Sequence, residues 1–328
     1  GVGMTPFGDH SGSSMTRLAS WAIDDALADA SCDRAQIEAA WFANTGQGAL
    51  EGQHMIRGQV ALRPLGFEGI PIINVENACA SASTALHGAM NFLLAGGADI
   101  VLAVGAEKMS HLDRARSFGL FDAGWDVSDP SGNLKTLVEL GGIDPAGWPP
   151  PAETRSIFMD VYAAFARQHM RLFGSTQEQF AAVSAKNHAH SVQNPRAQYQ
   201  RAYTVDEVLA ARPIVWPLTL PMCAPISDGA AAAVLCTAKG LRRLGAHRRA
   251  IRLNACVIGT SVNRAPDDLG RHLGRLISTK AYETAGICPQ DVSVAEVHDA
   301  TAVGEVIQVE NLGLCAPGEG GISALSGD

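Results

Sequence analysis

Two short segments of the sequence combine residue types that can carry out covalent chemistry. Cys79 lies in Asn77-Ala78-Cys79-Ala80-Ser81, where small neighbours leave room for a substrate to approach. His298 lies in Glu296-Val297-His298-Asp299. A thiolate can accept an acyl group, and an imidazole can move a proton or donate a hydrogen bond to an oxyanion. The two segments therefore predict acyl transfer onto sulfur, with Cys79 as nucleophile and His298 as its partner.

The position expected for Cys79 favours a reactive thiol. An apolar run over 72–75 predicts a strand, and the pattern over 79–94 predicts a helix that is apolar on most sides and therefore buried. The partial positive charge at a helix amino terminus lowers a thiol pKa, and its free N–H groups can bind an oxyanion. The alternative is a structural cysteine that only fills space in a core helix.

His298 is expected at a matching junction in the second part of the chain. The sequence predicts a strand over 292–297 and a helix over 302–312. His298 would then act as an acid, a base or an oxyanion donor, with Asp299 orienting it. In the structural alternative, His298 only packs and Asp299 only caps the helix; Thr301 is a second candidate for that cap.

The elements that must position these residues alternate along the chain, which is typical of an α/β fold. A loop excursion rich in Gly, Asp and Pro is expected over 117–152. Strand and helix recur in the same order near each reactive residue, which suggests a duplicated architecture. Strands are expected over 39–44, 72–75, 99–104, 230–235, 251–258 and 292–297, and helices over 16–30, 79–94, 153–173, 176–190, 204–211, 273–285 and 302–312.

Composition excludes several classes of function. The 328 residues are 47% hydrophobic and 18% charged, which excludes a disordered chain. The net charge of −8 and an aromatic content of 6% argue against a nucleic-acid partner. No apolar run approaches the roughly 18 residues of a membrane-spanning helix, so we expect no membrane span. The sequence holds no glycine-rich phosphate loop, so nucleotide chemistry is not indicated.

Cysteine usage and the amino-terminal residues favour the cytoplasm. The seven cysteines are odd in number and have no C-x-x-C spacing, which fits a reducing compartment better than disulfides or a zinc ribbon. Residues 1–8 show no secretory leader. His188 and His190 form an H-x-H pair on a predicted helix without a third ligand nearby, so we expect no metal site.

Several motifs, in the right order, resemble the thiolase superfamily along nearly the whole chain. The last two below resemble the sterol-carrier-protein type, in which His-Asp replaces the Asn-Glu-Ala-Phe of other thiolases. The motifs are Asn77-Ala78-Cys79-Ala80-Ser81-Ala82-Ser83-Thr84-Ala85-Leu86, Gly96-Gly97-Ala98-Asp99, Gly105-Ala106-Glu107-Lys108-Met109-Ser110, Lys186-Asn187-His188, Asn194-Pro195, Ser227-Asp228-Gly229-Ala230-Ala231-Ala232, Glu296-Val297-His298-Asp299 and Glu310-Asn311-Leu312-Gly313-Leu314-Cys315.

The resemblance implies a five-layered fold of two similar α/β halves. Residues 1–111 and 216–247 would form the amino-terminal half, 112–215 an inserted loop domain that covers acyl-CoA, and 248–328 an incomplete carboxy-terminal half. Cys79 would be the acyl acceptor and His298 an oxyanion-hole or acid/base group. Acyl-CoA would be the substrate, with its binding residues unassigned and no cofactor bound permanently. The assembly would be a homodimer or tetramer.

Two departures from the family pattern leave the reaction open. Ala300 stands where the sterol-carrier type usually has a second reactive cysteine, and the chain ends before the Gly-His-Pro segment that supplies another histidine. The first hypothesis is a thiolase-type acyl-CoA acyltransferase. The second is a retro-aldol lyase acting on a hydroxyacyl-CoA of the steroid side-chain type with an OB-fold partner. The third is a non-catalytic thiolase-like subunit.

Overall fold

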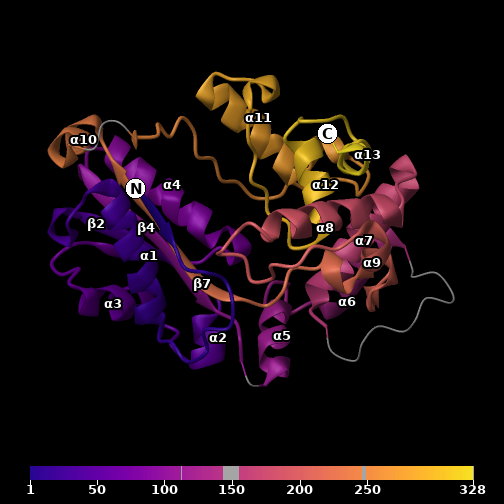
Figure 1. Ribbon diagram of the computed structural model, residues 1–328, viewed down its shortest axis with the longest axis horizontal. Helices are drawn as coiled ribbons and strands as arrows, with labels where there is room; N and C mark the ends of the chain where they lie inside the picture. Colours follow the sequence, from indigo (N-terminus) through magenta and orange to yellow (C-terminus); the bar gives the residue numbers. More distant parts are fainter. Residues whose placement is uncertain (112, 143–154, 246–248, 328) are drawn as a thin grey trace. The chain divides into compact units, whose positions relative to one another are not determined.

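The computed structural model describes residues 1–111, 113–142, 155–245 and 249–327 (Figure 1). Contacts between Cα atoms divide the chain into two units. Unit 1 contains residues 1–117 and 226–258, and unit 2 contains residues 118–225 and 259–328. Of the helices in the described ranges, none is both long enough and apolar enough to cross a membrane.

A five-stranded sheet lies at the centre of unit 1. Its strands run in the order β1-β7-β4-β2-β3, and β2 is parallel to both β3 and β4. The carboxyl ends of these three strands therefore meet at one edge of the sheet. The antiparallel strand β7 separates β4 from β1. The bounds are Val2–Met4 for β1, Ala39–Ala43 for β2, Ile72–Val75 for β3, Ile100–Lys108 for β4 and Asp228–Cys236 for β7.

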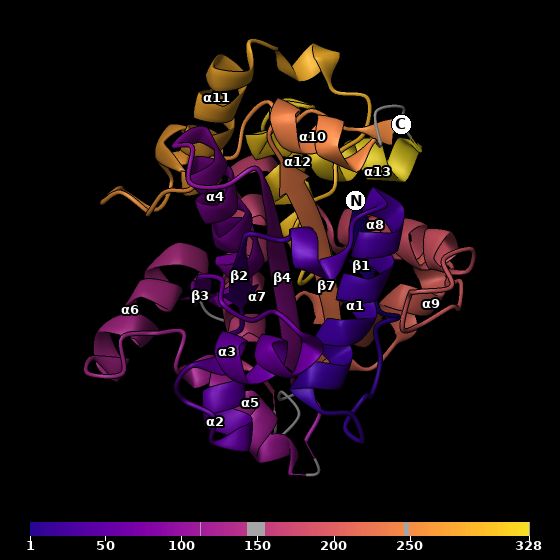
Figure 2. The same ribbon diagram turned by 90° about the vertical axis from the view of Figure 1, so that its left-hand side faces the viewer.

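Helices cover both faces of this sheet. Figure 2 shows α1 (Met15–Ala30) on one side and α4 (Ser81–Leu94) on the other. Successive side chains of β2 alternate between the faces: Ala40 and Phe42 join the core beneath α1, while Ala39 and Trp41 join the core beneath α4. Residues 39–43 are therefore all buried, which is why the strand reads as one continuous apolar run.

Helix α4 is less enclosed than the sequence predicts. Within it only Ser81, Ala85 and Ala89 are buried, and Leu94 at its end is exposed. These three residues recur every four positions and form one stripe that contacts the sheet. The expectation of a helix buried on most sides is therefore wrong, because α4 packs through one narrow face of small residues.

Unit 2 is built mainly from helices. Its core lies between α7, α8, α9 and α12 and includes Phe180, Leu218 and Val303. A two-stranded antiparallel sheet joins β5 to β6. The bounds are Pro130–Gly141 for α6, Ile157–Phe173 for α7, Gln177–Ser191 for α8, Val205–Ala210 for α9, Pro213–Val215 for β5, Leu218–Thr219 for β6, Leu273–Ala285 for α11, Ala302–Asn311 for α12 and Gly320–Ser326 for α13.

Most expected elements are confirmed within a few residues, and the expected loop over 117–152 is not. Short helices complete the two units: Gln47–Glu51 (α2), Arg57–Leu62 (α3), Arg114–Asp122 (α5) and Ala238–Leu244 (α10). Helices α5 and α6 occupy much of the expected loop. Asp129 caps α6 by accepting from the Gly132 N–H, and Pro130 suits the first helical position. Residues 143–154 lie outside the described ranges.

The strands expected over 251–258 and 292–297 are wrong. Neither segment belongs to a strand, and both leave apolar side chains exposed: Ile251 is 93% exposed and Val294 is 82% exposed. An apolar run predicts strand conformation, but a strand also needs a neighbour that accepts its backbone hydrogen bonds. The described residues place no ladder partner beside either segment. Only the second of these segments lies in unit 2, where the sheet found in the described residues is the two-stranded pair of β5 and β6.

Candidate functional site

Cys79 lies at the carboxyl edge of the sheet in unit 1. Strand β3 ends at Val75, and a 3-10 turn over Ala78–Ala80 leads into α4. Cys79 is therefore in the turn before the helix, two residues earlier than the first residue of α4. Its side chain is exposed. The position agrees with the expected strand–helix junction.

The turn that carries Cys79 contains an unusual backbone conformation. Ala78 has a φ of +45°, in the left-handed region that favours glycine. For a residue with a Cβ this conformation costs about 1–2 kcal/mol, so other contacts must hold it. The Ala78 N–H donates to Glu76 Oε1 at 2.7 Å, and the Ser81 hydroxyl donates to the Ala78 carbonyl at 2.7 Å. The backbone immediately before Cys79 is thus fixed from both sides.

The electrostatics of Cys79 differ from the expectation. Burial raises the pKa of the Cys79 thiol, and the N–H of Cys79 itself, which points at the sulfur, lowers it. Desolvation is the larger of the two effects, so the expected lowering of the thiol pKa by the helix terminus is wrong for unit 1 alone. No cation among the described residues contributes to the pKa of this thiol.

His298 lies in unit 2 on an extended segment that leads into α12. The Ala224 N–H donates to the Ala300 carbonyl at 2.9 Å, and a single β-bridge pairs Cys223 with Thr301. These contacts fix the chain at Ala300 and Thr301, just beyond His298. Thr301 caps α12, since its side chain accepts from the Gly304 N–H. The helix cap is therefore Thr301, and Asp299 is free for another role.

Asp299 belongs to a charged cluster that the sequence did not predict. Glu305 pairs with Lys186 and accepts from Asn187 Nδ2 at 2.6 Å, while the same amide lies 3.3 Å from Asp299 Oδ2. Burial, and then the neighbouring Glu305 charge, raise the pKa of Asp299. A carboxyl group with a raised pKa next to His298 is suited to accepting and returning a proton.

The signal for this cluster is divided between distant parts of the sequence. Lys186 and Asn187 lie on α8 and Glu305 lies in the first turn of α12, 118 or more residues away. Lys186-Asn187-His188 stood out as a motif, but nothing local connects it with Glu305. Packing of α8 against α12 brings these residues together.

The two histidines of the H-x-H pair on α8 are not arranged as metal ligands in the described residues. The His188 ring lies 3.3 Å from the Pro221 carbonyl and packs edge-on against Tyr203, whereas His190 is exposed. Throughout the described ranges, no group of three or more His, Cys, Asp or Glu side chains could hold a metal ion. His188 is therefore a packing residue.

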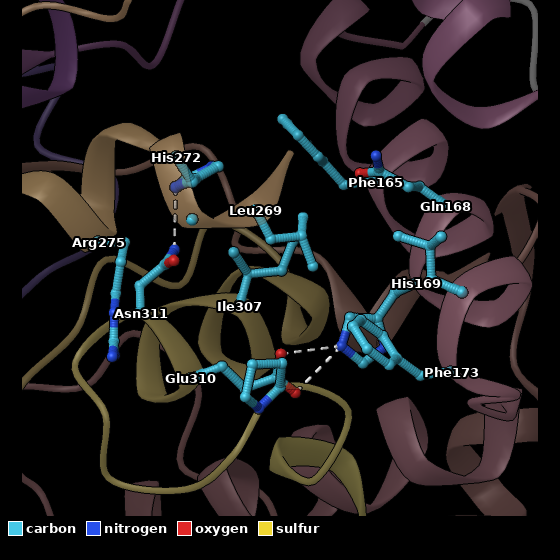
Figure 3. A pocket seen from close by; sticks show the side chains of 13 residues that line it. Phe165, Gln168, His169, Phe173, Leu269, His272, Arg275, Ile307, Glu310 and Asn311 are labelled. Atoms are coloured by element: carbon cyan, nitrogen blue, oxygen red, sulfur yellow. Dashed lines mark hydrogen bonds and ion pairs between the residues drawn. The ribbon is translucent and has the colours of Figure 1, made fainter. Parts of the chain in front are cut away.

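A cavity of about 250 Å³ lies in unit 2 between α7, α12 and the start of α11 (Figure 3). At one wall His169 is buried between the Ser175 hydroxyl, 2.7 Å away, and the Glu310 carboxylate, 3.1 Å away. Neither Cys79 nor His298 lines this cavity, and its α12 residues begin at Ile307, beyond the first turn. The buried pair of His169 and Glu310 forms part of the polar lining of the cavity and joins α7 to α12.

The two residues selected from the sequence lie in different units. Cys79 is in unit 1, while His298, Asp299, Lys186 and Glu305 are in unit 2. The structure brings the last four together around the start of α12. The pairing of Cys79 with His298 stays a prediction.

Comparisons with known proteins show the family to which the chain belongs. The model for the thiolase N-terminal domain matches residues 1–209, and the thiolase C-terminal domain-like model matches residues 260–328. The chain is 32% identical to sterol carrier protein 2 of Oryctolagus cuniculus, covering 100% of this chain and 58% of that protein. It is 33% identical to acetyl-CoA acetyltransferase of Methanothermobacter thermautotrophicus, covering 98% of this chain and 78% of that protein.

Two further similarities extend this comparison. The chain is 32% identical to benzoylsuccinyl-CoA thiolase subunit BbsB of Thauera aromatica, covering 98% of this chain and 76% of that protein. The solved structure of the Ltp2-ChsH2(DUF35) aldolase superposes with a TM-score of 0.70 at 22% identity, covering 100% of this chain and 79% of that one. This last similarity shows a shared fold. The chain spans 58% of the length of the sterol carrier protein it matches.

Proposed function

We propose, since the chain belongs to the thiolase family, that it is an acyl-CoA acyltransferase that forms an acyl-enzyme on Cys79. The observation that carries this proposal is that Cys79 is an exposed residue in a fixed turn at the carboxyl edge of the sheet, with its own N–H hydrogen-bonded to the thiol. A thiol beside a fixed N–H donor has the two groups that attack on a thioester requires.

The first step transfers an acyl group from CoA to the enzyme. The Cys79 thiolate attacks the thioester carbonyl, a new bond forms between carbon and Sγ, and the bond from carbon to the CoA sulfur breaks. CoA leaves as a thiol after receiving the proton that Cys79 gave up. The N–H groups of the turn stabilise the oxyanion during attack, since the first turn of a helix leaves them without helical acceptors.

The second step needs a group that removes a proton from the incoming nucleophile. In Claisen condensation the nucleophile is the α-carbon of a second acyl-CoA. In the thiolytic direction Cys79 instead attacks the 3-keto carbon of a 3-ketoacyl-CoA, the bond between C2 and C3 breaks, and the departing acyl-CoA carbanion takes up a proton. CoA then gives up its thiol proton and takes the acyl group from Cys79. Ala300 cannot serve as a base. Of the two carboxylates near His298, Asp299 is the stronger candidate for this base, because the Glu305 carboxylate already pairs with Lys186. His298 would orient the thioester carbonyl or share the proton.

The wider biological setting follows from the same proposal. The substrate would be an acyl-CoA of lipid metabolism and the enzyme a homodimer or tetramer in the cytoplasm. Support comes from the acetyl-CoA acetyltransferase and benzoylsuccinyl-CoA thiolase relatives, whose names refer to CoA thioesters. The division into an amino-terminal half (1–111 and 216–247), an inserted loop domain (112–215) and a carboxy-terminal half (248–328) belongs to this proposal as well.

Intact-mass measurement after incubation with acetyl-CoA tests the acyl-enzyme. We expect one acetyl group on the wild-type chain and none on the Cys79→Ala variant. Cys288→Ala is the matched control, because Cys288 is also an exposed free cysteine. Acetylation that persists in Cys79→Ala, or that is absent from the wild-type chain, would contradict the proposal.

A retro-aldol lyase is the second candidate, favoured by Ala300 and by the fold shared with a protein named as an aldolase with a DUF35 component. In this reaction a base removes the hydroxyl proton of a hydroxyacyl-CoA, the adjacent C–C bond breaks, and the resulting carbanion takes up a proton. An OB-fold partner would bind the CoA. No covalent cysteine is needed, so full lyase activity in Cys79→Ala would favour this candidate. Turnover of either kind would exclude a purely non-catalytic subunit.

A further inference from the structure

The Thr45 hydroxyl connects the end of β2 with the turn that carries Cys79. Thr45 Oγ1 lies 3.2 Å from the Ala78 carbonyl oxygen and 3.0 Å from Ser81 Oγ. Ser81 gives its one hydroxyl hydrogen to the Ala78 carbonyl and accepts from the Asn77 N–H at 2.8 Å. The Thr45 hydroxyl, which also has one hydrogen, donates to the Ala78 carbonyl and lies within hydrogen-bond distance of Ser81 Oγ. Two hydroxyl groups thus hold the Ala78 carbonyl, one residue before Cys79.

Thr45 is held in turn by the buried carboxylate of Glu107 at the end of β4. Glu107 accepts from the Thr45 N–H at 2.8 Å, from the Gly46 N–H at 3.0 Å and from Asn44 Nδ2 at 2.9 Å. The Arg57 guanidinium donates to Asn44 Oδ1 at 2.8 Å. Burial raises the pKa of Glu107, and the N–H groups of Thr45 and Gly46 followed by the Arg57 charge oppose that shift. A carboxylate that accepts three N–H groups clamps residues 44–46 as one rigid loop.

The parallel sheet explains why these residues meet. Thr45 follows β2, the Cys79 turn follows β3 and Glu107 lies next to the last residue of β4, and all three strands point the same way. None of these contacts involves unit 2. The network therefore fixes the left-handed Ala78, and with it the direction of the Cys79 N–H and sulfur, from within unit 1.

We propose that Thr45, supported by Glu107, is a positioning residue for Cys79. This inference rests on the proposed function of Cys79 as the acyl acceptor. Attack on a thioester requires the sulfur and the oxyanion donor to be aligned together, and a displacement of about 1 Å can cost on the order of 100-fold in rate. Alkylation by iodoacetamide requires only an accessible thiolate. Loss of positioning should therefore slow acylation much more than alkylation.

The experiment compares Thr45→Val, which removes the hydroxyl, with Thr45→Ser, which keeps it. Thr279→Val is the matched control, since Thr279 donates to the Arg275 carbonyl on an exposed helix far along the chain. Glu107→Gln is a second test variant, because an amide can accept with only one of its two polar atoms. Each variant is measured for single-turnover acetylation by acetyl-CoA, for iodoacetamide alkylation of Cys79, and for amide hydrogen exchange in a peptide covering 76–82.

We expect Thr45→Val and Glu107→Gln to acetylate at least roughly tenfold more slowly than the wild-type chain. Alkylation should stay within about twofold of wild type, and residues 76–82 should exchange faster. Thr45→Ser should restore acetylation, and Thr279→Val should match the wild type throughout. Equal losses of acetylation and alkylation, or failure of Thr45→Ser to restore acetylation, would overturn the inference.

The exchange measurement separates this inference from the proposed function. If the wild-type chain is not acetylated at all, the acyl-acceptor role of Cys79 fails. Faster exchange over 76–82 in Thr45→Val, but not in Thr279→Val, then still supports Thr45 as the residue that fixes the turn. Unchanged exchange in Thr45→Val overturns the inference whether or not acetylation occurs.

Discussion

Asp299 provides a prediction in which stability and activity should change in opposite directions. Its pKa is raised by burial and by Glu305, so the ionised form is less favourable in the folded state than in the unfolded state. This carboxyl therefore stabilises the fold below its unfolded pKa of about 3.9, and that contribution is lost as the pH rises through the folded value. Asp299→Asn should raise the Tm by a few degrees at pH 7 and not at pH 3.

The same variant should lose activity, because an amide cannot accept and return a proton. We expect the thiolase turnover rate to fall by about 100-fold or more. Asp267→Asn is the opposite control: the Arg171 side chain lowers the pKa of Asp267 to about 2, so its removal should lower the Tm at pH 7. Thermal melts at the two pH values and turnover assays measure both effects. A lower Tm for Asp299→Asn at pH 7 would contradict the raised pKa.

Helix α4 is an element whose position depends on one small residue. A Cβ placed on Gly88 would lie 2.7 Å from Trp41 Nε1, and Trp41 is only 6% exposed. Gly88→Ala should therefore push α4 away from β2 and cost about 1–3 kcal/mol. In Gly119→Ala, by contrast, the new Cβ meets no atom within 4 Å, so the helix α5 should gain up to about 1 kcal/mol. Thermal denaturation of the two variants measures the difference, and a Gly88→Ala variant as stable as wild type would contradict tight packing here.

At this scale the sequence predicts elements well wherever local pattern determines them. The strand over 72–75 and the helix over 273–285 have the expected ends, because apolar runs and periodicity are properties of neighbouring residues. Contacts between elements are different. Thr45 and Ala78 are 33 residues apart, and Lys186 and Glu305 are 119 apart. Cys79 and His298 were selectable by residue type and position, but these supporting partners become visible only once the strands and helices are packed.

At the scale of the whole molecule, two apolar segments that belong to no strand should differ from the paired strands in hydrogen exchange. Residues 251–258 and 292–297 have apolar sequences typical of strands, yet no ladder partner in the described ranges. Their N–H groups should therefore exchange with solvent roughly tenfold or more faster than those of β4 and β7, which pair along their full length. Hydrogen exchange followed by peptide mass spectrometry compares the four regions directly. Equal protection would mean that the two segments are paired.

The predicted pairing of Cys79 with His298 gives a further prediction about the whole molecule. In unit 1 desolvation raises the pKa of the Cys79 thiol, and no described cation there opposes it. The pairing of Cys79 with His298 that the sequence predicts would supply a base, and the His298 ring makes no hydrogen bond within the described residues. An imidazolium beside the sulfur would favour the thiolate and shift thiol ionisation to lower pH.

His298→Ala should therefore move the midpoint of the pH profile for Cys79 alkylation to higher pH and slow acetylation by about 100-fold or more. His190→Ala is the matched control, because His190 is an exposed histidine of the same unit at the end of α8. Its profile should match the wild type. If all three proteins share one alkylation profile, His298 does not act on Cys79, and the thiol must obtain its proton acceptor from another group. A shift in His298→Ala alone would establish that a unit 2 side chain controls ionisation of a unit 1 sulfur.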